Sequence, residues 1–141
     1  MSYVVDTSVF LRWWVEQVGW QHAHRVRDQF LAAEIVLITP EFTRIEFAEV
    51  LRKKALLDGI LNEAEYLDAV ASLDVLGVDL VPLDRDGILR AAALGARRNL
   101  RLFDALGASL ALDRGLPLLT GDARCARALA GVVEVEVLDG I

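Results

Sequence analysis

Short apolar runs rich in β-branched residues alternate along this chain with longer segments of helical character. The apolar runs, which we read as strands, cover residues 3–5, 35–38, 78–83, 118–120 and 132–138. Strands separated by helices are typical of βαβ units, which place strands side by side in parallel. The sequence therefore predicts an α/β fold, with a mainly parallel sheet of about four or five strands flanked by about seven helices.

The segments between the strands carry helix start and stop signals. They predict helices over residues 9–15, 21–33, 40–57, 62–76, 84–98, 103–113 and 122–130. Pro40 suits the first turn of one helix, Asn62 is a good N-cap for another, and Gly59 and Gly77 are typical stop residues. No repeat, linker or low-complexity tract interrupts the chain, so we expect one domain over residues 1–141.

Composition excludes several classes of protein. The single cysteine, Cys125, rules out a disulfide framework and a multi-cysteine zinc site. Charged residues interrupt every apolar stretch well before the roughly 20 residues that a bilayer requires, so no membrane segment is expected. The N-terminus lacks the basic and apolar regions of a secretory signal, which favours a cytoplasmic protein.

Charge is distributed unevenly. The formal net charge is −6, which argues against strong non-specific binding to duplex nucleic acid. The stretch from Gly87 to Phe103 nevertheless contains four arginines and no acidic residue. Arginine is a good bidentate partner for phosphate, but a solvated helix face is the simpler explanation for any one such cluster.

Two aspartates lie where α/β folds place their chemistry. Asp6 directly follows the strand 3–5, and Asp122 follows the strand 118–120. Ligands of such folds bind beyond the carboxyl ends of the strands. The alternative is that each aspartate only caps the helix that follows, which would stabilise that helix by about 1 kcal/mol.

Two further acids stand out inside apolar helices. Asp104 is the only charged residue between Leu102 and Leu112, near the predicted start of a helix, so capping again competes with a functional role. Glu46 lies well past the first turn of its helix, where capping cannot explain it. A surface ion pair with Arg52 or Lys53 remains the alternative for Glu46.

Convergence of these four acids would require a cation. Two carboxylates about 5 Å apart repel by roughly 3 kcal/mol at an effective dielectric constant of 20, and four repel by several times more. Oxygen ligands without histidine or cysteine select a hard ion such as Mg²⁺ or Mn²⁺. Such an ion can activate water and neutralise a phosphodiester, so acids surrounded by arginines favour a nuclease.

Four motifs in order resemble the PIN domain family, and most closely its VapC-type toxin endoribonucleases. The motifs are YVVDTSVFL (3–11), RIEFAEVL (44–51), LFDALGASLAL (102–112) and LPLLTGD (116–122). The resemblance extends from Tyr3 to Leu138 and implies a parallel sheet flanked by helices. It also implies a Mg²⁺- or Mn²⁺-dependent ribonuclease, the toxin of a type II toxin–antitoxin pair, with an antitoxin partner and a homodimeric assembly.

By motif, the resemblance assigns metal binding and catalysis to four acids: Asp6, Glu46, Asp104 and Asp122. Hydroxyls of Thr7 or Ser8 and of Thr120 fall where family members support the acidic site. Arginines near the site, with Arg97, Arg98 and Arg101 as the leading candidates, are expected to contact RNA phosphates.

Two positions depart from the family pattern. Glu49 stands where many relatives have Asn, and Phe103 stands where Tyr is frequent. Glu49 would either add charge to the site or lie elsewhere on the surface.

Two other interpretations remain open. A PIN-type nuclease that matures ribosomal or transfer RNA would use the same chemistry without a toxin role. A non-catalytic α/β interaction module, with its acids serving only as helix caps, would show weak metal affinity. Nucleotide-binding glycine loops are absent from the sequence.

Overall fold

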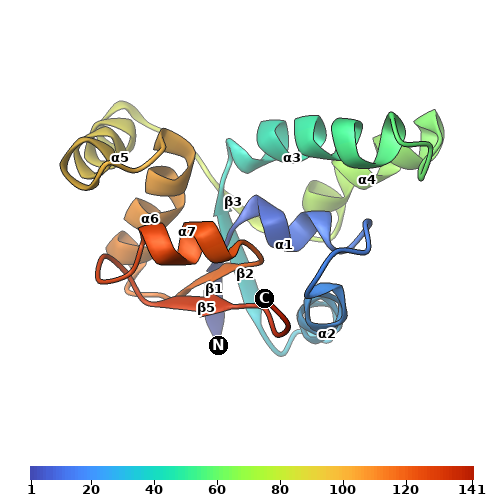
Figure 1. The fold of residues 1–141 in the computed structure, drawn as a ribbon, viewed down its shortest axis with the longest axis horizontal. Coiled ribbons are helices and arrows are strands. Elements are labelled where there is room, and N and C mark those ends of the chain that lie inside the picture. The colour runs from blue at the N-terminus through green and yellow to red at the C-terminus, as the bar shows by residue number, and fades with distance from the viewer.

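A five-stranded, all-parallel sheet forms the centre of the computed structural model, which describes all 141 residues (Figure 1). The order across the sheet is β3-β2-β1-β4-β5. The strands are β1 (Ser2–Val5), β2 (Val36–Pro40), β3 (Asp79–Val81), β4 (Leu118–Thr120) and β5 (Val135–Val137). The chain starts at the central strand and adds strands first on one side and then on the other, so β1 and β4 are neighbours.

Seven α-helices connect and cover these strands. They are α1 (Thr7–Leu11), α2 (Trp20–Leu31), α3 (Thr43–Leu51), α4 (Glu63–Val75), α5 (Arg85–Arg98), α6 (Leu102–Arg114) and α7 (Ala123–Ala128). A π-helical turn, η1 (Arg52–Leu56), extends α3. The predicted α/β class, parallel sheet, strand number and helix number are therefore confirmed. No helix has the length and apolar character needed to cross a membrane.

Two predicted helix starts are wrong. Pro40 does not open a helix but ends β2, where it pairs with Val81, and α3 begins at Thr43. Proline lacks an N–H donor, so the end of a strand accommodates it. The helix predicted over 9–15 begins earlier and is shorter, because Asp6 caps α1 and the helix ends at Leu11.

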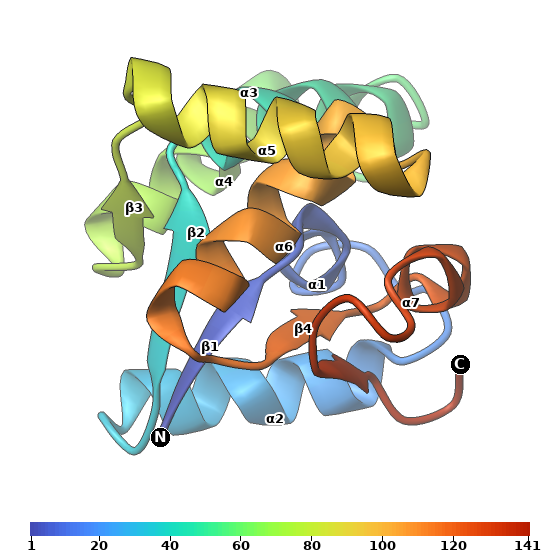
Figure 2. The same ribbon diagram turned by 90° about the vertical axis from the view of Figure 1, so that its left-hand side faces the viewer.

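The two faces of the sheet pack against different helices. Alternate side chains of β1 point to opposite faces, so Val5 joins a large cluster with Phe10 and Phe47 from α1 and α3. Val4 joins a second cluster with Leu118 and with residues of α6 and α7. Figure 2 shows α6 running beside the sheet, with α5 packed on its outer side. The result is a three-layer α/β/α domain.

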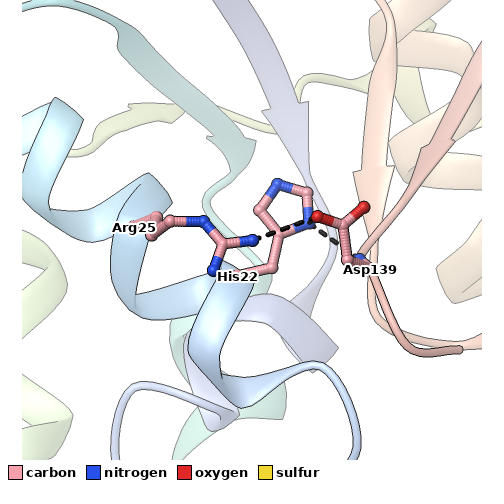
Figure 3. Close-up of polar contacts among 3 residues, drawn as sticks. All are labelled: His22, Arg25 and Asp139. Atoms are coloured by element: carbon pink, nitrogen blue, oxygen red, sulfur yellow. Dashed lines mark hydrogen bonds and ion pairs between the residues drawn. The ribbon is translucent and has the colours of Figure 1, made fainter.

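The C-terminal segment is tied to α2. Figure 3 shows the Asp139 backbone N–H donating to His22 Nδ1 at 2.8 Å, while Arg25 pairs with the Asp139 carboxylate at 3.0 Å. Gly19 permits this close approach because its φ is +92° and an added Cβ would lie 3.1 Å from Leu138 Cβ. Ile141 is thereby brought to the rim of the cleft described next.

Candidate active site

A single cleft of about 490 Å³ is lined by all four candidate acids. Asp6 and Asp122 enter it from the carboxyl ends of β1 and β4, which are adjacent in the sheet. Glu46 enters from the first turn of α3 and Asp104 from the first turn of α6. The prediction that Glu46 lies well past the first turn is wrong, because α3 begins at Thr43, but its side chain still does not cap the helix. Four segments that are far apart in sequence therefore bring their carboxylates to the end of the sheet where α/β folds bind ligands.

Hydroxyl groups hold the Asp6 carboxylate. Its Oδ2 atom accepts hydrogen bonds from Ser8 Oγ and, at 3.1 Å, from Thr120 Oγ1. Ser8 Oγ in turn accepts from the Gly121 backbone N–H at 2.8 Å. Oδ2 also receives the Ser8 backbone N–H at 3.4 Å, so Asp6 caps α1 as well as facing the cleft. Capping and participation in the acidic cluster are thus compatible at this position.

Glu46 is half-buried and receives a hydrogen bond from the Thr7 hydroxyl. Burial raises the pKa of Glu46, the Thr7 hydrogen bond lowers it, and the Asp6 and Asp104 carboxylates raise it again. The surface ion pair considered for Glu46 is instead made by Glu49, whose Oε1 lies 2.6 Å from Arg52 Nε. Glu49 is exposed and does not line the cleft.

Asp104 is not a helix cap. The N-cap residue of α6 is Arg101, and Asp104 lies inside the first turn, half-buried. Burial raises the pKa of Asp104, the Asp6 carboxylate adds to the increase, and the nearby Arg101 guanidinium opposes it. The raised pKa values of Glu46 and Asp104 have the same two physical causes, loss of solvent and proximity to other carboxylates.

Asp122 serves as the N-cap of α7. Its Oδ1 atom accepts the Arg124 backbone N–H at 2.8 Å, and its own N–H donates to Thr120 Oγ1 at 3.1 Å. The capping interpretation is therefore correct for this residue. The same carboxylate is half-buried and lines the cleft together with Glu46 and Asp104.

The donor set fits a hard divalent cation. The groups available are carboxylates with hydroxyls beside them, which Mg²⁺ and Mn²⁺ prefer. One thiol lies close: atoms of Asp6, Asp104 and Cys125 are within 4.8 Å of one another. Burial and the surrounding carboxylates raise the pKa of the Cys125 thiol, which favours its protonated form in the metal-free protein.

Three basic side chains also line the cleft: Arg101, Lys54 and Arg12. Of the arginines predicted to contact RNA, only Arg101 is among them. Arg97 and Arg98 lie exposed on the last turn of α5, outside the cleft lining.

Arg12 was missed by sequence reasoning. It is only 9% exposed, and it donates from Nε to the Val18 carbonyl at 2.7 Å and from Nη1 to the Ser8 carbonyl at 2.8 Å. Burial lowers the pKa of Arg12, while the Asp122 and Asp6 carboxylates raise it. Its signal in the sequence is that it is the only charged residue between Asp6 and Glu16.

The fold and the cleft together define an α/β domain with an acidic site at the carboxyl end of a parallel sheet. The model of the PIN domain matches residues 3–131, so the chain belongs to the PIN domain family. No curated protein sequence matches the chain.

Solved structures of toxin–antitoxin systems resemble the chain over nearly its whole length. VapBC-5 from Mycobacterium tuberculosis is 27% identical, with 97% of both chains covered and a TM-score of 0.59. A toxin–antitoxin complex from Klebsiella pneumoniae is 18% identical, with 99% of both chains covered and a TM-score of 0.68. VapBC2 from Rickettsia felis, solved with a promoter DNA fragment, is 13% identical, with 99% of this chain and 100% of that chain covered and a TM-score of 0.67. The chain thus resembles VapC-type toxins, and the last two likenesses concern the fold alone.

Proposed function

We propose that this protein is a metal-dependent endoribonuclease and the toxin of a type II toxin–antitoxin pair. The observation that carries the proposal is that Asp6, Glu46, Asp104 and Asp122 line one cleft. Two of these acids, Glu46 and Asp104, are half-buried with raised pKa values and cap no helix. A non-catalytic module whose acids are only caps leaves these two unexplained.

The four acids would hold Mg²⁺ or Mn²⁺. When bound, such an ion lowers the pKa of a water molecule and offsets the negative charge of a phosphodiester. The Thr7 hydroxyl fixes the orientation of Glu46, and the hydroxyls of Ser8 and Thr120 fix that of Asp6. These hydrogen bonds hold Glu46 and Asp6 in the cleft beside the other carboxylates despite their mutual repulsion.

The cationic side chains would position the RNA. Arg101 and Lys54, both at the cleft, are suited to bind phosphates on either side of the bond that is cut. Arg97 and Arg98 would continue this basic surface along the end of α5 and contact phosphates farther along the chain. The net charge of −6 limits such binding to this local surface.

The toxin role rests on resemblance. VapBC-5, a member of the VapBC family of toxin–antitoxin systems, is 27% identical to the chain along nearly its full length. On that basis residues 1–141 form one toxin domain that acts on RNA in the cytoplasm. An antitoxin would then occupy the cleft region, and two copies of the chain would form a homodimer. A PIN nuclease that processes RNA without an antitoxin would have the same active site.

Cleavage of a structured RNA pool by the purified protein tests the proposal. Mn²⁺ or Mg²⁺ should support cleavage, EDTA should abolish it, and Asp6→Asn should abolish it while the protein stays folded. Melting temperatures measured with and without metal serve as a second readout, since a ligand that binds only the folded state stabilises it. If the protein shows neither cleavage nor a metal-induced rise in melting temperature, the proposal is contradicted and a binding module is favoured.

A further inference from the structure

One buried arginine lines the acidic cleft without an ion-pair partner. Arg12 directly follows α1, is 9% exposed and is the only buried arginine of the chain. Five other arginines form ion pairs with carboxylates, and each of their side chains is at least 30% exposed. Burial of a cation is costly unless a negative charge compensates it. The buried guanidinium of Arg12 therefore differs from the others in having no carboxylate in direct contact.

Two backbone carbonyls fix the guanidinium and leave one nitrogen free. Nε donates to the Val18 carbonyl at 2.7 Å, and Nη1 donates to the Ser8 carbonyl at 2.8 Å. Nη2 makes no hydrogen bond, and it is not a buried atom, because Trp14 Nε1 is the one buried side-chain nitrogen or oxygen without a partner. Since Arg12 lines the cleft, the N–H groups of Nη2 are open to a ligand there.

Gly121 makes room for the guanidinium. A Cβ at this position would lie 2.7 Å from Nη1, 2.9 Å from Cζ and 3.1 Å from Nε of Arg12. The φ of Gly121 is not positive, so the close approach of Arg12, and not the backbone conformation, requires glycine. Figure 2 shows β4, which ends just before this glycine, beside α1. The turn that carries Asp122 into the cleft is thus packed directly on Arg12.

The two acids nearest to Arg12 do not occupy its free nitrogen. Asp122 and Asp6 are close enough for their charges to raise the pKa of Arg12 against the effect of burial. Asp6 nevertheless accepts its hydrogen bonds from hydroxyls, and Asp122 accepts one from a backbone N–H of α7. Neither carboxylate accepts from Arg12, whose two hydrogen bonds go to carbonyls. The cleft of about 490 Å³ has room for a phosphate group beside the free donor.

We propose that Arg12 is a catalytic residue that binds the phosphodiester to be cut, with Nη2 donating to one of its non-bridging oxygens. This inference rests on the proposed nuclease function and adds a residue to its active site. Arginine stays protonated in proteins, so Arg12 is a fixed donor and takes no part in proton transfer. Its position is set before RNA binds, so no reorganisation is needed as negative charge develops on the phosphate oxygens.

Arg12 differs in this respect from the other two cations of the cleft. Arg101 and Lys54 are exposed side chains, which lose rotamer freedom when they bind a ligand. Arg12 has already lost that freedom on folding, and it lies next to the turn that carries Asp122. Arg12 therefore suits the phosphate that is cut, while Arg101 and Lys54 suit the phosphates on either side.

Binding of inorganic phosphate tests this contact without relying on cleavage. Isothermal titration calorimetry in saturating Mg²⁺ gives the phosphate affinity of the wild type, Arg12→Lys and Arg12→Gln. Affinity for Mn²⁺ and the melting temperature are measured for each protein, because a purely structural role would change these as well. Arg127→Gln is the matched control, since it removes the same charge from an exposed site on α7 outside the cleft lining.

Arg12→Gln should bind phosphate about 10- to 100-fold more weakly than the wild type, because a charge-assisted hydrogen bond is lost. Arg12→Lys keeps the charge and should lose less. Mn²⁺ should bind Arg12→Gln no more weakly than the wild type, because a positive charge near the acids has been removed. In the RNA cleavage assay kcat should fall about 100- to 1000-fold, with a much smaller change in KM. Arg127→Gln should match the wild type in phosphate binding.

A measurement on the wild-type protein covers the case in which Arg12→Gln does not fold. Crystals soaked with Mn²⁺ and tungstate, an anomalous scatterer that mimics phosphate, should show tungsten beside Nη2 of Arg12. Tungstate bound in the cleft only at Arg101 or Lys54 would overturn the inference.

Two results with the variants would also overturn it. The first is a folded Arg12→Gln variant that binds phosphate and cleaves RNA as the wild type does, which would leave the nuclease proposal intact. The second is a parallel loss of phosphate affinity, Mn²⁺ affinity and melting temperature, which indicates a structural role alone. Phosphate binding that depends on Arg12 in a protein that cuts no RNA would instead overturn the nuclease proposal and retain Arg12 as a phosphate ligand.

Discussion

The Thr7 hydroxyl, in the first turn of α1, donates a hydrogen bond to Glu46 on α3. The two residues are 39 positions apart in the sequence. Thr7 is 6% exposed, so water cannot easily replace its hydroxyl as the donor. This hydrogen bond lowers the pKa of Glu46 against the opposing effects of burial and of the Asp6 and Asp104 charges. Thr7 therefore helps to keep Glu46 ionised and oriented toward the cleft.

Replacing Thr7 with valine tests this relationship. Thr7→Val keeps the shape of the side chain but removes the donor, so we expect Glu46 to be protonated more readily and Mn²⁺ to bind about tenfold more weakly, the equivalent of roughly 1.4 kcal/mol. Isothermal titration calorimetry measures the change. Thr7→Ser retains the hydroxyl and should bind Mn²⁺ nearly as well as the wild type. Equal affinities for all three proteins would show that the hydrogen bond is not important for the site.

The raised pKa values of Glu46 and Asp104 predict how stability without metal depends on pH. The ordinary values are 4.5 for Glu46 and 3.8 for Asp104, and both pKa values are higher in the folded protein. The folded state therefore binds more protons than the unfolded state above these values. The extra stability that these two groups give the folded state is complete below their ordinary pKa values, and it is lost as the pH rises through their folded-state pKa values.

Glu46→Gln should reduce this pH dependence. In EDTA at pH 7 the variant should be more stable than the wild type, and the difference should shrink as the pH falls toward 4.5. Urea unfolding followed across this pH range gives the comparison. With Mn²⁺ present the order should reverse, because the metal stabilises the wild-type carboxylate cluster. A difference that grows toward acidic pH would contradict the pKa direction.

Gly121→Ala should damage the site through Arg12. A Cβ at Gly121 would lie 2.7 Å from Arg12 Nη1, and the buried guanidinium is fixed by its bonds to the carbonyls of Val18 and Ser8. The Gly121 N–H also bonds Ser8 Oγ, which supports Asp6. We expect a loss of about 1–3 kcal/mol in stability and a much lower cleavage rate.

Gly107→Ala is the matched control. Its Cβ would meet Leu118 Cδ1 at 3.6 Å, an ordinary contact, within α6. Alanine favours a helix by about 0.5–1 kcal/mol over glycine, so this variant should be as stable as the wild type or more so. Thermal melting of both variants measures this difference in stability. A Gly121→Ala protein with wild-type stability and activity would show that Arg12 can move without cost.

Glu49 should be dispensable. It is exposed, pairs with Arg52, and does not line the cleft. Exposed ion pairs contribute little, so Glu49→Gln should leave stability essentially unchanged. Metal stoichiometry and cleavage rate should match those of the wild type. A change in the number of bound ions would place Glu49 in the site after all.

The sheet and most helices could be predicted because their signals are local. The alternation of apolar runs with capped helices located all five strands, and Asn62 and Asp84 act as N-caps where the sequence indicated helix starts. The errors arose where tertiary packing, and not the local sequence, determines the backbone conformation. Pro40 joins the ladder of β2 and β3, and the π-helical turn at Arg52–Leu56 has no local signal.

The four acids could be proposed from strand ends and motifs, but their convergence could not. The hydrogen bond between Thr7 and Glu46 depends on how α3 crosses α1, which no local pattern specifies. Arg12 could not be assigned for a similar reason, because one of its hydrogen bonds is made to the Val18 carbonyl, in a loop whose path is set by the fold. Arg97 and Arg98 stood out by charge alone, and their exposed location shows that charge does not fix distance from the site.

The most direct test of the account is the location of Mn²⁺ in crystals of the protein by anomalous X-ray scattering. We expect a strong peak bounded by the carboxylates of Asp6 and Asp104, with Glu46 and Asp122 around it, and no such peak in Asp6→Asn crystals. Absence of manganese from this cleft in the wild-type protein, under conditions that support RNA cleavage, would contradict the account.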